Sequence, residues 1–265
     1  MMGRFGSAVI PKEHGAWAVL LVPVTVSVFI AEHVTTDLLL LMASAMSFFL
    51  AYYPLQTMLR GRSGDQRSRF WAGVYIVAGI VFGVPLLVRG FLLLIPIAAL
   101  AAGCFFVSVS LVRGKPKSVG ADLWAVIGLT MTGPSAGYVL NNSLSMDTVF
   151  VWILHVLFFG SGVIYVHMKL RAAALRKVHI DLRQRMGLGA LNLVYHVFVI
   201  VVVSVFVATH YTPALTLVAF VPMSVHALMG TVKLSPTVRF RNLGFLLLAQ
   251  SLVYGFLLGI AYGEG

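Results

Sequence analysis

Apolar runs long enough to cross a membrane recur along the whole of this 265-residue sequence. A helix needs about 20 predominantly apolar residues to cross the hydrocarbon core of a bilayer. Hydrophobic residues make up 60% of the chain, charged residues make up only 10%, and the mean hydropathy is +0.96. Too little polar surface remains to cover a water-facing globule. The sequence therefore predicts an all-α, polytopic transmembrane helical bundle that forms one integral membrane domain over residues 1–265.

Nine spans are predicted from the hydropathy of successive segments. They lie near residues 16–31, 38–57, 70–88, 91–112, 123–140, 148–167, 191–209, 214–233 and 243–262. The short links at 89–90 and 210–213 predict two tight antiparallel hairpins, one of spans three and four and one of spans seven and eight. No cleaved signal peptide is predicted, because a small-residue cleavage site is absent and the first apolar run is long enough to span.

The distribution of lysine and arginine predicts how these spans are oriented. With the N-terminus on side one, 18 of the 19 basic residues fall on that side, and Arg89 alone falls on the other. Basic residues accumulate in cytoplasmic loops, so the N-terminus is expected in the cytoplasm and the C-terminus outside. The predicted location is the bacterial inner membrane. The net charge of +11 is thus loop charge, and nucleic acid is not an expected partner.

A weak internal repeat suggests two four-helix units, spans two to five and six to nine, with span one as an addition. Spans two and six each end in a tyrosine-led polar edge that runs into arginine, at residues 52–60 and 165–171. Such a parallel repeat would place two long basic links opposite one another across a pseudo-twofold axis. A site between these links would be lined by arginine, lysine, tyrosine and histidine.

The segment PKEHGAWA at residues 11–18 resembles the opening signature of the YwiC-like family of bacterial membrane proteins. The resemblance extends along the chain in hydropathy and loop charge. It implies a bacterial integral membrane protein, but it brings no established reaction.

The nine-span layout, with long cytoplasmic links after spans two and six, also resembles the UbiA superfamily of intramembrane prenyltransferases. That resemblance implies a UbiA-like fold in which both links carry aspartate-rich motifs that hold Mg²⁺ and a prenyl diphosphate. Here one link has Asp65 alone among four arginines, and the other has Asp181 alone. Such isolated carboxylates are poor Mg²⁺ ligands, so no metal and no cofactor are predicted. Arginine can hold a phosphate or carboxylate without a metal.

The predicted site is a cytoplasm-facing cavity walled by the start of span one and the ends of spans two and six. It is expected to bind membrane lipids, or an isoprenoid or other amphiphile with an anionic head. Glu13 and His14 are the candidate catalytic acid or base, because helix-start chemistry does not explain why His14 accompanies Trp17 one turn away. The competing interpretation is interface anchoring with a hydrogen bond between helices. The candidate substrate-binding residues are Lys12, Trp17, Tyr52, Tyr53, Gln56, Arg60, Tyr165, His167, Lys169, Arg171, Asn192 and His196.

Other polar residues have structural interpretations that compete with a functional one. Asp122 opens span five, where capping of the helix is the favoured role. Histidines within the spans, such as His155, are more readily explained by hydrogen bonds between helices than by metal binding. The sequence around Pro134 predicts a kink that could open a cavity.

Two other functions stay open at this point. The protein could transport a small anion or a lipid-like molecule, with the kinked helices as gates. It could also be a non-catalytic assembly factor for another membrane complex, whose protein partners the sequence does not identify. The single cysteine, Cys104, lies in an apolar run and allows neither a disulfide nor a cysteine metal site.

Overall fold

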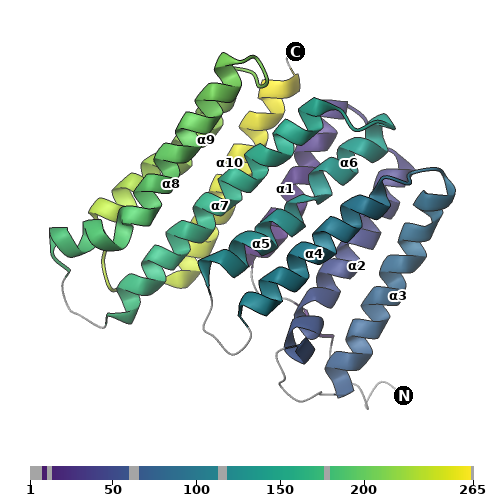
Figure 1. Ribbon diagram of the computed structural model, residues 1–265, viewed down its shortest axis with the longest axis horizontal. Helices are drawn as coiled ribbons and strands as arrows, with labels where there is room; N and C mark the ends of the chain where they lie inside the picture. Colours follow the sequence, from purple (N-terminus) through teal and green to yellow (C-terminus); the bar gives the residue numbers. More distant parts are fainter. Residues whose placement is uncertain (1–7, 11–13, 60–65, 113–117, 176–179, 264–265) are drawn as a thin grey trace.

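The structure, a computed structural model, describes residues 8–10, 14–59, 66–112, 118–175 and 180–263, and its regular elements there are all α-helices. The helices are α1 (His14–Ala31), α2 (Thr36–Leu59), α3 (Gln66–Val88), α4 (Leu94–Leu111), α5 (Val119–Thr130), α6 (Thr132–Asn141), α7 (Met146–Ala174), α8 (Leu182–Ala208), α9 (Thr216–Val232) and α10 (Phe240–Gly263). Only Met131 separates α5 from α6, so these two helices form one rod. Counted this way, the helices form successive antiparallel rods that coincide with the predicted spans (Figure 1). The predicted all-α transmembrane bundle is confirmed.

Seven of these rods are long and apolar enough to cross a membrane: α2, α3, α4, the α5–α6 rod, α7, α8 and α10. The remaining two helices, α1 and α9, are apolar but shorter, and each contains a proline, Pro23 and Pro222. The outer faces of the long helices expose apolar side chains such as Val77 on α3 and Val194 on α8, at 60% and 66%. Surfaces of this kind face lipid in a multi-pass membrane protein.

α1 lies at the centre of the bundle and joins two hydrophobic clusters. The larger cluster contains residues of α1, α7, α8, α9 and α10, and Leu154 and Leu258 are fully buried in it. The smaller cluster packs α1 against α2, α6 and the corner between α3 and α4, around Leu38 and Leu86. A central first helix is compatible with its being an addition to two helical units. The internal repeat itself stays a prediction.

One of the two predicted hairpins is wrong. α8 and α9 pack along each other, as expected from their short link. α3, in contrast, packs along α2, and α4 packs along α5. An ion pair between Arg89, just after α3, and Asp37, at the start of α2, joins α2 and α3 at one end of the bundle. A short link brings two helix ends together, but it does not dictate which side-chain faces meet.

The break in the α5–α6 rod lies at Met131, three residues before the predicted centre at Pro134. Pro134 sits in the first turn of α6, where the missing proline N–H costs no helical hydrogen bond. Side-chain hydrogen bonds connect the region of the break to α1. Ser27 of α1 donates to the Gly133 carbonyl at 3.0 Å, and Thr132 donates to the Leu20 carbonyl of α1 at 2.8 Å. The break therefore fastens the α5–α6 rod to α1.

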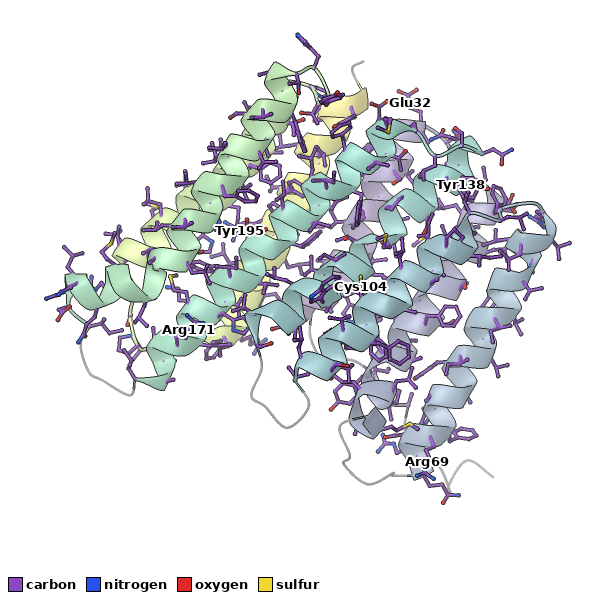
Figure 2. All side chains as sticks on the ribbon, viewed as in Figure 1. Glu32, Arg69, Cys104, Tyr138, Arg171 and Tyr195 are labelled. Atoms are coloured by element: carbon purple, nitrogen blue, oxygen red, sulfur yellow. The ribbon has the colours of Figure 1, made fainter. Side chains whose placement is uncertain are left out.

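The described basic residues gather at one end of the bundle, which we call the basic end. Figure 2 shows Arg69 and Arg171 at this end, whereas Glu32 and Tyr138 lie at the opposite end. Of the described lysines and arginines, only Arg89 belongs to the opposite end. The placement of the basic end in the cytoplasm stays a prediction.

Candidate functional site

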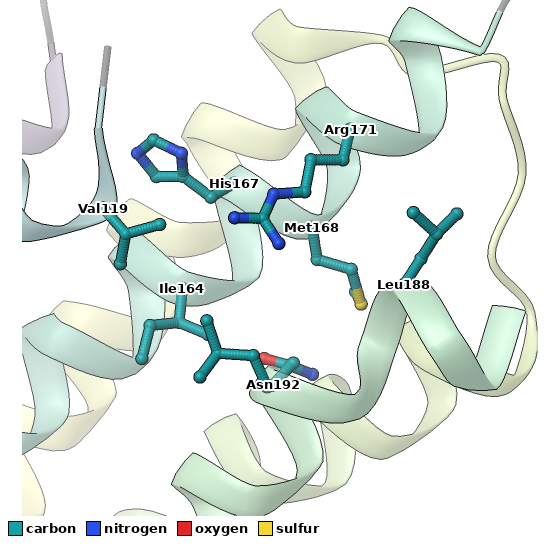
Figure 3. Close-up of a pocket in the computed structure, with 8 residues that line it drawn as sticks. Val119, Ile164, His167, Met168, Arg171, Leu188 and Asn192 are labelled. Atoms are coloured by element: carbon teal, nitrogen blue, oxygen red, sulfur yellow. The ribbon is translucent and has the colours of Figure 1, made fainter.

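A narrow pocket lies at the basic end where α5, α7 and α8 meet (Figure 3). Its lining residues are Val119 of α5, Ile164, His167, Met168 and Arg171 of α7, and Leu188, Leu191 and Asn192 of α8. The cavity has a volume of about 10 Å³, which is enough for one water-sized group. Three of the predicted binding residues, His167, Arg171 and Asn192, thus share one pocket.

His167 is fixed to α5 by a carboxylate. Its Nε2 lies 2.8 Å from the Asp122 carboxylate, which accepts the hydrogen bond. The predicted capping role of Asp122 is wrong, because the N-cap is Ser118, whose hydroxyl accepts from the Ala121 N–H. Asp122 lies in the first turn of α5 and is available to hold an imidazole on the next rod. A carboxylate partner of this kind sets the ring orientation and the tautomer of a histidine.

Arg171 is the cation that the pocket presents to a ligand. Its side chain is exposed, and its guanidinium has no hydrogen bond or ion pair among the described residues. Figure 3 shows this guanidinium beside His167. Lys169 is engaged elsewhere: its ammonium donates to the Gly230 carbonyl of α9 at 3.3 Å and lies 5.3 Å from the centre of the Tyr165 ring. Two cations predicted to bind the same head group therefore differ in availability.

Asn192 connects α8 to α9 and contributes to the pocket from its other side. Its amide nitrogen donates to the Ala227 carbonyl at 3.2 Å and to the Thr231 hydroxyl at 3.0 Å. Its backbone carbonyl lies 2.7 Å from Nδ1 of His196. The side-chain oxygen of Asn192 and Nε2 of His196 are both buried, and neither has a partner in the described part of the chain. His196 lies outside the pocket lining.

Tyr165 belongs to a second polar group, between α7, α9 and α10. Its ring is 2% exposed and packs 4.6 Å from the ring of His226, centre to centre. Nδ1 of His226 lies 3.1 Å from the side-chain oxygen of Gln250 on α10. A Cβ at Gly230 would lie 2.2 Å from the Tyr165 hydroxyl, so only glycine allows α9 this close. This group joins helices and lies beside the pocket rather than in it.

The predicted site residues on α1 and α2 lie in a different region. Gln56 donates to the Tyr52 hydroxyl at 3.1 Å, and the Tyr52 ring packs 5.0 Å from Phe105 of α4. Tyr53 is 48% exposed. Trp17 packs on Phe49 of α2, with ring centres 4.9 Å apart. The α4–α5 pair and α1 stand between α2 and α7, and Trp17 of α1 packs toward α2, so these side chains are not brought together with His167 and Arg171 (Figure 1).

The candidate catalytic residues are not placed by the structure. Lys12, Glu13 and Arg60 lie outside the described residues, and so does the side chain of His14, although α1 begins at that residue. Their roles stay predictions. Within the described part of the chain, no group of three or more histidine, cysteine, aspartate or glutamate side chains could hold a metal ion.

Sequence reasoning missed the link between Asp122 and His167. A signal was present, because Asp122 starts one predicted span and His167 ends the next. Antiparallel neighbours place such residues at the same end of a bundle. Sequence reasoning also missed the contact between His155 and Tyr254, whose hydroxyl lies 3.2 Å from Nδ1 of the fully buried histidine. These two residues are 99 positions apart, and no local spacing indicates their contact.

The fold and this pocket define a class: a polytopic membrane protein with a cation at the mouth of a pocket at its basic end. Residues 10–137 match the YwiC-like protein family, so the predicted resemblance to that family is confirmed. An uncharacterized protein of Haemophilus influenzae is 24% identical over 165 residues, which cover 61% of this chain and 67% of that protein. No solved structure matches the chain significantly. The resemblance to the UbiA superfamily stays a prediction.

Proposed function

We propose that this protein binds an isoprenoid or lipid-like amphiphile through an anionic head group at the basic end. The observation that carries the proposal is the Arg171 guanidinium, which stands at a pocket without a partner among the described residues. Arginine presents a planar fork of donors that matches phosphate and carboxylate, and such charge-assisted hydrogen bonds are among the stronger ones. A head group at Arg171 would also lie beside the imidazole of His167.

The apolar part of the ligand has a continuous surface to follow. Val119, Ile164 and Leu188 make the pocket wall apolar next to Arg171. Farther along α8, Leu191 and Val194 are 46% and 66% exposed, on the face that would meet lipid. An acyl or prenyl chain can therefore leave the pocket sideways and remain in the bilayer, while the head stays at the basic end.

The second part of this proposal is that the protein chemically modifies the bound head group. Glu13 and His14 would supply the acid or base, since they belong to the YwiC-like signature at residues 11–18. His167, held by Asp122, would position the head group. Lipid and isoprenoid profiling of a deletion strain complemented with Glu13→Ala or His14→Ala tests this part. An altered lipid species restored only by the wild-type protein supports chemistry, and full restoration by both variants rejects the assigned roles.

Binding is tested by native mass spectrometry of the purified protein with its co-purified lipids. Arg171→Gln should lower the occupancy of an anionic amphiphile by about tenfold or more, because a hydrogen bond to a charged group contributes about 1.5–3 kcal/mol. Arg183→Gln is the matched control, since Arg183 is an exposed cation at the same end of the bundle but does not line the pocket. Equal occupancy in Arg171→Gln and wild type would reject the proposal, as would equal losses in the two variants.

Transport of a small anion or lipid-like molecule is the second candidate function. The break at Met131 favours it, because discontinuous helices recur at the binding sites of membrane transporters. Where the break meets α1, Ser27 donates to the Gly133 carbonyl and Thr132 donates to the Leu20 carbonyl. Transport would appear in the deletion strain as a changed flux of the molecule with unchanged lipid species, whereas binding coupled to chemistry changes the lipids themselves.

A further inference from the structure

The inner end of the α5–α7–α8 pocket carries a buried acceptor that lacks a donor. Asn192 is 1% exposed, and its side-chain oxygen has no partner in the described part of the chain. Both hydrogens of its amide nitrogen are used, one by the Ala227 carbonyl and one by the Thr231 hydroxyl. A carbonyl can only accept, so the amide cannot be turned around without facing one acceptor with another. The oxygen is therefore fixed on the side away from α9.

An acceptor buried in this way costs about 1–3 kcal/mol unless a donor reaches it. Asn192 lines the pocket, so the donor can come from there. The cavity volume of about 10 Å³ admits one group the size of a water molecule. A hydroxyl has this size, whereas a phosphate or carboxylate does not. The anionic part of a ligand must consequently stay at the exposed mouth of the pocket.

Arg171 and Asn192 together match a head group with two parts, an anion and a hydrogen-bond donor. Figure 3 shows them on opposite sides of the pocket, with Met168 and Ile164 between them. The guanidinium requires an anion, and the amide oxygen requires a donor. An ammonium group would donate too, but its charge would lie near the guanidinium and be repelled by it. A neutral hydroxyl can donate to the amide oxygen without adding a positive charge near the guanidinium, and a separate anionic group can bind the guanidinium.

We infer that the amphiphile bound at this site carries a hydroxyl group next to its anionic group, and that this hydroxyl enters the pocket and donates to the Asn192 side-chain oxygen. The inference rests on the proposed function and narrows its substrate class to hydroxylated anionic amphiphiles. A site built around a hydroxyl discriminates strongly against analogues that lack it, because the buried acceptor is then left unpaired.

A pair of lipids that differ only in this hydroxyl pattern tests the inference. The delipidated protein is offered equal amounts of dioleoyl phosphatidylglycerol and dioleoyl phosphatidylpropanol, which share chains, phosphodiester charge and a three-carbon head. Native mass spectrometry then measures how much of each lipid binds. We expect wild type to prefer phosphatidylglycerol about tenfold or more, in line with the cost of an unpaired acceptor. Asn192→Leu should bind both lipids alike.

Val119→Phe is a second variant that leaves the contacts of Asn192 with α9 in place. The larger side chain fills the pocket from α5, and it should also abolish the preference. This variant and wild type decide the matter if Asn192→Leu fails to fold. Equal binding of both lipids by wild type, still dependent on Arg171, would overturn the inference and leave the proposed function standing.

Two further outcomes concern the amphiphile itself. Failure of wild type to bind either lipid would overturn the inference and the proposed function together. Displacement of the lipid by an equal concentration of glycerol 3-phosphate would show that the tail contributes nothing, and would replace the amphiphile by a free phosphate ester. Displacement only at a large excess of glycerol 3-phosphate supports a bound lipid.

Discussion

At the scale of single residues, small side chains decide how closely the helices approach one another. A Cβ at Gly189 of α8 would lie 2.2 Å from the Thr231 methyl of α9, whereas nothing lies within 4 Å of a Cβ at Gly187. Interfaces built on small residues are typical of membrane helices, because close backbone approach replaces the hydrophobic effect as a driving force. The position of Thr231 matters to the pocket, since this residue accepts a hydrogen bond from Asn192.

We predict that Gly189→Ala destabilises the protein by about 1–3 kcal/mol, the usual cost of overpacking. Gly187→Ala, two residues away on the same helix, should be neutral or slightly stabilising because it adds helix propensity without a clash. Denaturation in detergent, followed by circular dichroism, measures the difference. Equal stability of the two variants would show that α8 and α9 are not this close.

The pair formed by His155 and Tyr254 gives a second residue-scale prediction. Tyr254→Phe leaves His155, which already has an unpartnered Nε2, without its remaining hydrogen bond. The expected loss is about 1–3 kcal/mol of unfolding free energy. The double variant His155→Leu with Tyr254→Phe should recover much of this loss, because no buried polar group remains unpaired. Additive losses in the double variant would contradict the contact.

At the scale of helices, the span boundaries could be predicted from the sequence, but the contacts between spans could not. Hydropathy reports which residues avoid water, and all nine predicted segments correspond to helical rods. It does not report which neighbour a lipid-soluble helix selects, since lipid and protein are about equally apolar. The motifs around Tyr52 and Tyr165 look alike in sequence, yet α1, α4 and α5 separate them. The pocket therefore contains only three of the twelve predicted binding residues, His167, Arg171 and Asn192.

The break between α5 and α6 leads to a prediction about Thr132. Thr132→Val keeps the shape of the side chain but removes the hydrogen bond to the Leu20 carbonyl of α1. We expect a loss of about 0.5–1.5 kcal/mol, the net contribution of one such bond. Thr25→Val is the control, because Thr25 is exposed and bonds only to its own helix at Leu21. Equal effects in urea or detergent unfolding would mean that the break does not fasten the two helices.

At the scale of the whole molecule, the expected orientation in the membrane depends on the distribution of charge between the two ends. The described basic residues lie at one end, and Arg89, the exception, is neutralised by Asp37. Because cationic loops remain in the cytoplasm during insertion, the basic end and its pocket should face the cell interior. A ligand would then reach Arg171 from the cytoplasm or from the inner leaflet. This orientation is predicted from a simple count of loop charges and does not depend on packing, and it stays a prediction.

Cysteine accessibility tests this orientation directly. Cys104 is buried and is the single cysteine of the chain, so Cys104→Ala provides a clean background. Into it we would place Ser143→Cys, between α6 and α7, or Thr237→Cys, between α9 and α10, both at exposed positions on opposite ends of the bundle. A membrane-impermeant maleimide should label the first variant in intact cells and the second only in inverted membrane vesicles. Labelling of both variants from the same side, or in the reverse order, would contradict a basic end that faces the cytoplasm.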